Sequence, residues 1–199
     1  MFDDTYKTLK TTSKGLYTEK GSKFIALAFP VQNEDEVKAH IAEAKKNYYN
    51  AHHHCFAYIL VADKSAYRIN DDGEPPGTAG RPIYGQLLSH DITNILLIVI
   101  RYFGGTKLGV PGLINAYRSA AKDAILNNEI IEKTIDETCK VYFNYQNMND
   151  IMCILKQDGV KINHQEYKEQ YMIAFTIRRS IVEKIMESLQ KIEGIKVQI

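Results

Sequence analysis

The sequence predicts a mixed α+β protein built from two domains. Apolar residues alternate with a period of two in some segments and recur at helical spacing in others. The pattern is interrupted around residues 127–134, and the segment after it reads strand, helix, strand, strand, helix, strand. That βαββαβ order is typical of a ferredoxin-like module. We therefore expect an N-terminal domain over residues 1–130 and a ferredoxin-like domain over residues 131–199.

The N-terminal domain is expected to mix strands with three helices. Residues 15–31 read as two strands around a turn at residues 20–22. A helix should follow Asn33, because Asn33 and Glu36 have the spacing of a capping box. Pro111 is expected at the first position of a long helix. Further strands are expected at 54–61, 66–69 and 95–100, and a further helix at 81–89.

In the C-terminal domain, Ser180 and Glu183 form a second predicted capping box. Gly159 and Gly194 follow the two expected helices, where helix-terminating glycines occur. The expected strands are 135–145, 160–167, 171–177 and 195–199, and the expected helices are 148–157 and 181–192.

Composition limits the function classes. The 199 residues carry 25 basic and 24 acidic side chains, so overall charge gives no support for strong nonspecific binding to nucleic acid or membrane. Three scattered cysteines fit a reducing compartment. No apolar signal core opens the chain, and the longest aliphatic run is far shorter than a membrane span. We expect a cytoplasmic protein without membrane contact.

Two glycine-rich segments, residues 70–82 and 101–109, carry the main functional signal. Each precedes an expected helix, where free backbone N–H groups bind anions. The alternative is that these glycines only permit tight turns and close packing. Neither a P-loop nor a G-x-G-x-x-G motif is present, so we expect no cofactor.

Two polar clusters lie near these segments. His52 to Cys55 contain zinc-ligand side chains, but no second ligand pair follows at zinc spacing, so we expect no metal site there. On a strand, His53 and Cys55 would share one face. Asp71, Asp72 and Glu74 could bind Mg²⁺ or act as bases, or they could hold their own turn through Asx hydrogen bonds. Arg81 and Arg101 are candidate partners for these acids.

At these motifs the chain closely resembles the YigZ/IMPACT family. The matching segments are His54–Tyr58, Asp71–Pro75, Gly77–Pro82, Arg101–Gly109, Pro111–Leu113 and Ala116–Tyr117, with Lys20–Phe24 before them. The resemblance implies an N-terminal domain like the second domain of a small-subunit ribosomal protein and like domain IV of elongation factor G. It implies a C-terminal domain like domain V of elongation factor G. Eukaryotic members of this family act in translational control.

The preferred function is a translation-linked regulatory or binding protein that recognises RNA or a ribosomal surface, and we assign it no catalytic residue. Residues 71–82 and 101–109 should lie side by side and form one binding surface. No sequence-specific DNA contact is expected. The expected nucleic-acid or anion contacts are Lys23, Arg81, Arg101, Tyr102, Phe103, Gly104, Gly105, Lys107 and Gly109. The motif residues whose role stays open are His54, Asp71, Asp72, Gly73, Glu74 and Thr78.

Two alternatives stay open. The first is an enzyme acting on a phosphorylated small molecule or nucleotide, with Gly104, Gly105 and Gly109 binding phosphate and Asp72 or Glu74 binding a metal or a proton. The second is a protein-only interaction module in translational control, as the eukaryotic members suggest.

Overall fold

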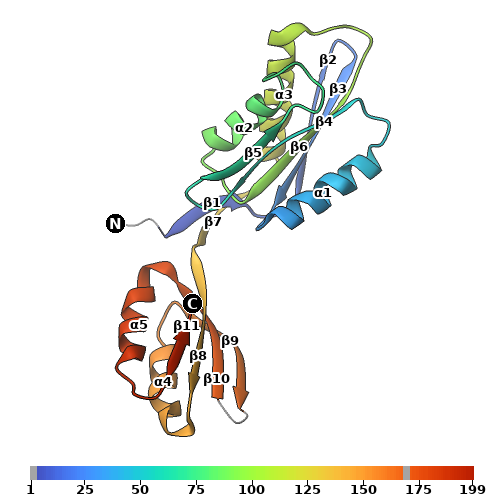
Figure 1. Cartoon of the computed structure of the whole chain (residues 1–199). Coiled ribbons are helices and arrows are strands. Elements are labelled where there is room, and N and C mark those ends of the chain that lie inside the picture. Colours follow the sequence, from blue (N-terminus) through green and yellow to red (C-terminus); the bar gives the residue numbers. More distant parts are fainter. Residues whose placement is uncertain (1–3, 168–170) are drawn as a thin grey trace. The chain divides into compact units, whose positions relative to one another are not determined.

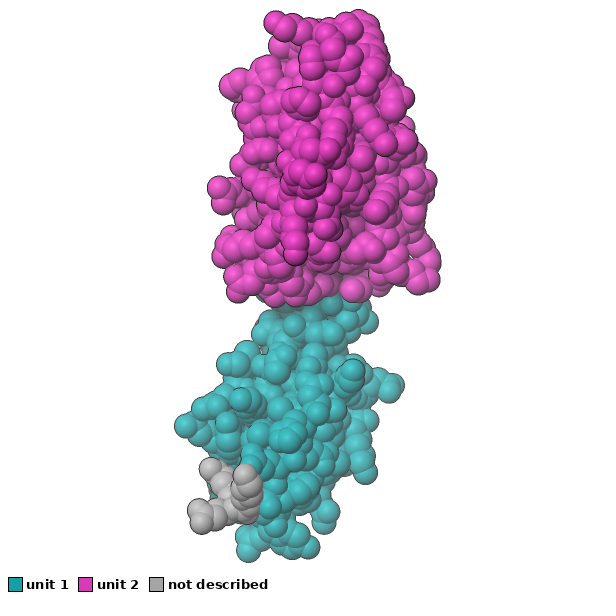
Figure 2. All heavy atoms as spheres, turned by 90° about the vertical axis from the view of Figure 1, so that its right-hand side faces the viewer, with its two compact units in different colours: residues 1–5, 134–199 teal, residues 6–133 magenta. Residues whose placement is uncertain are grey.

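The computed structural model describes residues 4–167 and 171–199. The chain divides into two compact units, one over residues 6–133 and one over residues 134–199 together with residues 1–5 (Figure 2). This is the mixed α/β two-domain class that the sequence predicts. The expected boundary assigned residues 1–5 to the N-terminal domain, whereas they group with the C-terminal unit.

A five-stranded antiparallel sheet forms the centre of the N-terminal unit (Figure 1). Its order is β2-β3-β6-β4-β5. The strands are β2 (Ser13–Glu19), β3 (Ser22–Pro30), β4 (His53–Leu60), β5 (Ala66–Asn70) and β6 (Ile95–Tyr102). The central strand β6 is apolar on both sides, because both faces of the sheet are covered.

Helices cover the two faces of this sheet. One face packs against α2 (Gly80–Ser89) and α3 (Gly109–Leu126), and the other packs against α1 (Glu34–Asn47). The strands β1 (Thr5–Leu9) and β7 (Ile130–Thr134) form a separate two-stranded sheet. The small buried side chains of α3, among them Ala116 and Ala120, let this helix lie close to the sheet.

The C-terminal unit is the ferredoxin-like module that the element order predicts. Its antiparallel sheet has the order β11-β8-β10-β9, with the first strand of the module beside the last. The elements are β8 (Asp136–Phe143), α4 (Met148–Leu155), β9 (Val160–Tyr167), β10 (Tyr171–Arg178), α5 (Val182–Gln190) and β11 (Lys196–Gln198), with short 3₁₀ turns η1 (Tyr145–Asn147) and η2 (Arg179–Ile181). The core contains α4, α5 and one face of the sheet.

Asp4 is part of the C-terminal unit through a bidentate ion pair. Its carboxylate accepts hydrogen bonds from Arg178 Nε at 2.6 Å and from Arg178 Nη2 at 2.8 Å. The Arg178 guanidinium and the Ser180 hydroxyl hold the pKa of Asp4 far below its usual range. This planar pair explains why the first residues group with the C-terminal unit.

Local sequence rules were right at one helix start and wrong at two. Asn33 Oδ1 accepts hydrogen bonds from the N–H groups of Asp35 and Glu36, which confirms the first cap. Pro111 is the third residue of α3 rather than the first, since the helix begins at Gly109. It still lies in the first turn, where its missing N–H removes no helical bond.

The predicted capping box at Ser180 is also wrong. Ser180 lies inside η2, and the residue that precedes α5 is Ile181, whose side chain makes no capping hydrogen bond. Ser180 instead hydrogen-bonds to Asp4. The sequence pattern S-x-x-E matches a capping box, but the Ser180 hydroxyl is hydrogen-bonded to Asp4 and does not cap the helix.

Candidate functional site

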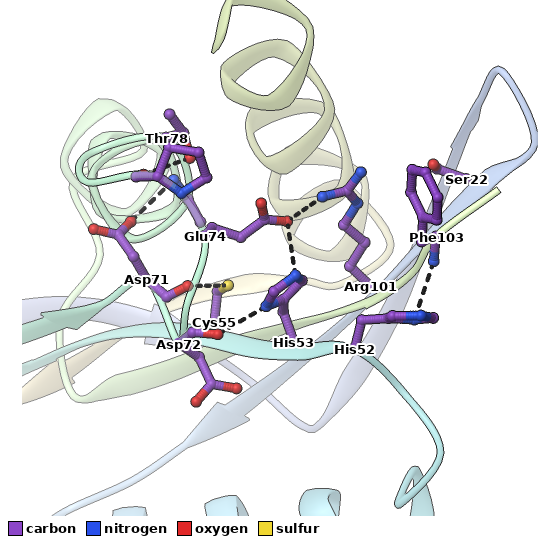
Figure 3. Close-up of polar contacts among 12 residues, drawn as sticks. Ser22, His52, His53, Cys55, Asp71, Asp72, Glu74, Thr78, Arg101 and Phe103 are labelled. Carbon is purple, nitrogen blue, oxygen red and sulfur yellow. Dashed lines mark hydrogen bonds and ion pairs between the residues drawn. The ribbon is translucent and has the colours of Figure 1, made fainter. Parts of the chain in front are cut away.

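A buried carboxylate lies where the two glycine-rich segments meet (Figure 3). The Glu74 side chain is 3% exposed, and its Oε1 accepts a hydrogen bond from Arg101 Nη1 at 2.5 Å and one from Tyr117 Oη at 2.8 Å. His53 Nε2 lies 3.8 Å from the same oxygen. Residues 71–82 and 101–109 are therefore in direct contact at Glu74 and Arg101, and Arg101 is the partner of the acidic segment.

Strand register brings these side chains together. Arg101 on β6 is the register partner of Phe24 on β3 and of His53 on β4. Register partners in an antiparallel sheet project to the same face, which here is the face that α2 and α3 cover. Tyr117 reaches the same point from the buried face of α3.

Arg101 acts as an internal support rather than as a free surface cation. Its guanidinium carbon lies 5.5 Å from the ring centroid of Phe24 and 5.6 Å from that of Phe103. Arg101 is 6% exposed, and its Nε is buried without a hydrogen-bond partner among the described residues. The Glu74 carboxylate neutralises its charge, and the guanidinium packs against the Phe103 ring.

Cys55 and Tyr117 extend the buried network. The Cys55 thiol lies 3.0 Å from the carbonyl oxygen of Asp71 and 3.3 Å from Tyr117 Oη. Burial raises the pKa of the Cys55 thiol and of the Tyr117 hydroxyl well above their ordinary values. Both groups stay protonated at neutral pH and serve as hydrogen-bond donors. A thiolate nucleophile is not available at this position.

The Asp71 carboxylate holds the backbone of the first glycine-rich segment, and the Asp72 carboxylate joins this segment to β4. Asp71 accepts hydrogen bonds from the N–H groups of Gly77, Ala79 and Gly80 at 2.8–3.1 Å. Asp72 Oδ2 accepts from the His54 N–H at 2.6 Å. The prediction that acids hold this turn is therefore confirmed for Asp71, whereas the Asp72 carboxylate bonds to the backbone of β4 instead of to its own turn. Because Asp71 occupies the N–H groups at the start of α2, these groups are not free for an external anion.

Thr78 and Gly73 also shape this segment. The Thr78 hydroxyl donates to the carbonyl of Pro75 at 2.7 Å, and the N–H of Thr78 donates to the same carbonyl at 3.1 Å. Gly73 has a φ of +86°, a conformation that glycine adopts without strain. Both residues build the turn that presents Glu74.

His53 and His54 project to different faces of β4, while His53 and Cys55 share a face as their alternation predicts. His53 Nδ1 lies 2.8 Å from the carbonyl of Asp72, whereas His54 Nε2 lies 3.2 Å from the carbonyl of Tyr48. Burial lowers the pKa of His54, so its ring favours the neutral form. Over residues 4–167 and 171–199, no group of three or more His, Cys, Asp or Glu side chains is arranged to hold a metal ion.

The second glycine-rich segment is joined to the turn between β2 and β3. The Gly104 N–H donates to Ser22 Oγ at 3.1 Å, and a Cβ on Gly104 would lie 1.9 Å from the carbonyl carbon of Gly21. Only glycine permits this approach. Gly105 and Gly109 have positive φ angles of 85° and 71°, and a Cβ on Gly105 would meet open space. The loop therefore lies against residues 20–22.

The predicted cations are not all brought together. Lys23 and Tyr102 are register partners on the face opposite Arg101, and Tyr102 donates to Asn50 Oδ1 at 3.0 Å. Arg81 is exposed in the first turn of α2, whereas Lys107 is exposed in the loop after Gly105. What the structure does bring together is the turn at residues 20–22 and the loop at residues 103–107.

Two side chains of this region were not assigned a role from the sequence. The sequence places Tyr117 only in a segment that matches the family, and Ser22 only in a turn. A single tyrosine on a helix face otherwise lined by alanine, leucine and isoleucine was the available signal, because a buried hydroxyl needs a partner. Ser22 offered no such signal, since serine is common in turns.

Comparison with known proteins identifies relatives over most of the chain. Residues 20–125 match the family model described as the Impact N-terminal domain. The "IMPACT family member YvyE" of Bacillus subtilis is 30% identical over 83% of this chain and 76% of its own length. The "IMPACT family member YigZ" of Escherichia coli is 31% identical over 75% of this chain and 74% of its own.

A solved structure also matches the whole fold. A crystal structure described as that of a hypothetical protein covers 98% of this chain and 97% of its own, with 24% identity and a TM-score of 0.76. This likeness supports the two-domain α/β architecture. Among the described helices, none is both long and apolar enough to cross a membrane.

Proposed function

The chain belongs to the family defined by the Impact N-terminal domain, and from this premise we propose that it is a translation-linked regulatory protein whose N-terminal unit binds RNA or a ribosomal surface. Translational control is what the family resemblance implies for its eukaryotic members. A curated relative called "Protein IMPACT homolog" in Saccharomyces cerevisiae is 28% identical over 58% of this chain.

One observation carries this proposal: the contact between Gly104 and Ser22 gathers cations and an exposed ring at one end of the sheet. We call Lys20, Lys23, His52, Phe103 and Lys107 the loop surface; it extends around the end of the sheet, since Lys23 projects from the face opposite Arg101. All three lysines are exposed. Phe103 is 41% exposed, and its backbone N–H donates to His52 Nδ1 at 3.3 Å. None of the three ammonium groups has an ion pair within the described part of the chain.

The loop surface suits a phosphate backbone with an accessible base. Ammonium groups contact phosphate oxygens without sequence preference, and an exposed aromatic ring offers a stacking platform. Beneath Phe103, Arg101 holds the ring in place, and Glu74 holds Arg101. In this proposal the buried cluster is the support of the surface, while Lys20, Lys23 and Lys107 make the phosphate contacts.

The test is binding of the full chain to purified ribosomes and to structured RNA. The test variant replaces the loop-surface lysines: Lys20→Gln, Lys23→Gln and Lys107→Gln. The control variant makes the same change in charge at exposed lysines elsewhere in the N-terminal unit: Lys46→Gln, Lys122→Gln and Lys133→Gln. We expect the test variant to bind at least tenfold more weakly than the control, since each lysine contact adds to affinity and to salt dependence.

Equal binding by the two variants would refute the loop surface as the RNA contact. Absence of ribosome and RNA binding by the unaltered chain, with a protein recovered on it instead, would favour the protein-only alternative.

A further inference from the structure

The four-stranded sheet of the C-terminal unit has one face without a helix. Alternation along β8 and β10 sends Val141 and Phe175 into the core with α4 and α5. Their neighbours in sequence therefore project to the other side. In Figure 1, both helices of this unit lie on the same side of the sheet. We call the exposed side the open sheet face and define it by Lys140, Tyr142, Lys161, His164, Met172 and Lys196.

Strand register arranges the open sheet face in rows. Across the first row, Tyr142 on β8 is paired with Lys196 on β11 and with Met172 on β10. The tyrosine therefore lies between a cation and a flexible apolar side chain. Tyr142 and Met172 are half-buried, which leaves part of each side chain open to a planar group.

The second row is centred on a small residue. Ala174 on β10 is paired with Lys140 on β8 and with His164 on β9. The short side chain at the centre leaves the sheet accessible between two longer polar groups. In the third row, Thr176 is paired with Lys161 and accepts a hydrogen bond from Asn163 Nδ2 at 2.6 Å.

The open sheet face has an excess of free positive charge. Lys140, Lys161 and Lys196 are exposed, and none of them has an ion pair among residues 4–167 and 171–199. The acidic residues of this face are Glu166 in the first row and Asp136 at the start of β8. At the end of the sheet, Arg178 is already neutralised by Asp4. Three ammonium groups thus surround a tyrosine and an alanine.

We propose that the open sheet face binds single-stranded RNA. An exposed antiparallel sheet in a ferredoxin-like module can stack bases on an aromatic side chain, while surrounding cations contact the phosphates. A protein partner fits less well, because lysine is depleted at the centres of protein interfaces. A duplex fits less well, because its bases are stacked inside it and cannot lie flat on a sheet. This proposal goes beyond the loop surface, since it concerns the other unit and does not require the loop surface to bind RNA.

The test measures binding of a labelled 12-nucleotide single-stranded RNA to the full chain by fluorescence anisotropy at several salt concentrations. The test variant carries Lys140→Gln, Lys161→Gln and Lys196→Gln. The control variant carries Lys156→Gln, Lys184→Gln and Lys191→Gln, which remove the same charge from exposed positions on or beside the helices of this unit. A third variant, Tyr142→Leu, removes the ring and keeps an apolar side chain.

We expect the test variant to bind at least tenfold more weakly than the control at about 100 mM salt. Its slope of log affinity against log salt should be shallower by about 2, since each single-strand phosphate contact contributes roughly 0.7. Tyr142→Leu should weaken binding about fivefold or more, which corresponds to about 1 kcal/mol for one lost stacking contact. Tyr142→Leu should weaken binding by the same factor when it is added to the loop-surface variant.

Four results would overturn the proposal. The first is no binding of single-stranded RNA by the unaltered chain. The second is equal weakening by the test and control variants, which would show only a general effect of charge. The third is competition by duplex RNA as strong as competition by the single strand. Loss of RNA binding in the loop-surface variant alone would refute the open sheet face and leave the proposed function standing.

Discussion

Replacement of Glu74 by alanine should destabilise the N-terminal unit far more than replacement of an exposed acid. Arg101 is 6% exposed, and Glu74 is its partner through the Nη1 hydrogen bond. Without the carboxylate, a guanidinium whose Nε already lacks a partner is left charged and buried, and Tyr117 loses its acceptor. Breaking a buried pair in this way costs about 3–5 kcal/mol.

Urea unfolding is the assay, with hydrogen exchange of peptides from β6 and α3 to report on the N-terminal unit. The free energy of unfolding falls by about 2 kcal/mol per M of urea. A loss of about 4 kcal/mol of this free energy should therefore lower the urea midpoint by roughly 2 M. Glu129→Ala is the matched control, because Glu129 forms an exposed ion pair with Lys10 that should contribute about 1 kcal/mol or less.

A double variant separates burial of charge from loss of packing. Glu74→Ala with Arg101→Leu leaves no buried charge, so it should be more stable than Glu74→Ala alone. If Glu74→Ala costs no more than Glu129→Ala, or if the double variant is the sum of the two single effects, the buried pair does not support the loop surface as described.

Three further predictions follow from the structure. Asp4→Asn should destabilise the C-terminal unit at pH 7. The difference should shrink as pH falls below 3.8, because a lowered carboxyl pKa contributes its full stability above the unfolded value and loses it as pH falls towards the folded value; urea unfolding at pH 7 and at acid pH checks this. Gly104→Ala should lower the melting temperature more than Gly105→Ala, since a Cβ at position 104 meets backbone atoms and one at position 105 does not. Cys153 should react with a thiol reagent in the native protein, whereas buried Cys55 should react only after unfolding.

Much of the fold could be predicted because it depends on local patterns. The alternation in β10 and the helical spacing in α3 each report which side of an element is buried, and the order of the C-terminal elements restricted that unit to one common module. The helix starts at Pro111 and Ser180 were less predictable. Whether a serine caps a helix depends on which group its hydroxyl contacts. The Ser180 hydroxyl contacts Asp4, which is remote in sequence.

The candidate site could be predicted only in part, for a related reason. The glycine-rich segments were visible as motifs, and Arg101 was already a candidate partner of the acids. The sequence did not reveal that Glu74 is buried, because its burial depends on Tyr117 and His53, which come from other elements. It also did not reveal that Lys23 projects from the face opposite Arg101, since this requires the register between β3 and β6.

The salt dependence of RNA binding by the full chain tests the central claim most directly. If Lys20, Lys23 and Lys107 each contact a phosphate, log affinity for structured RNA should fall with log salt with a slope steeper by about 2 to 3 in the unaltered chain than in the loop-surface variant. The control variant at Lys46, Lys122 and Lys133 should keep the slope of the unaltered chain. The same slope in all three proteins would contradict the account.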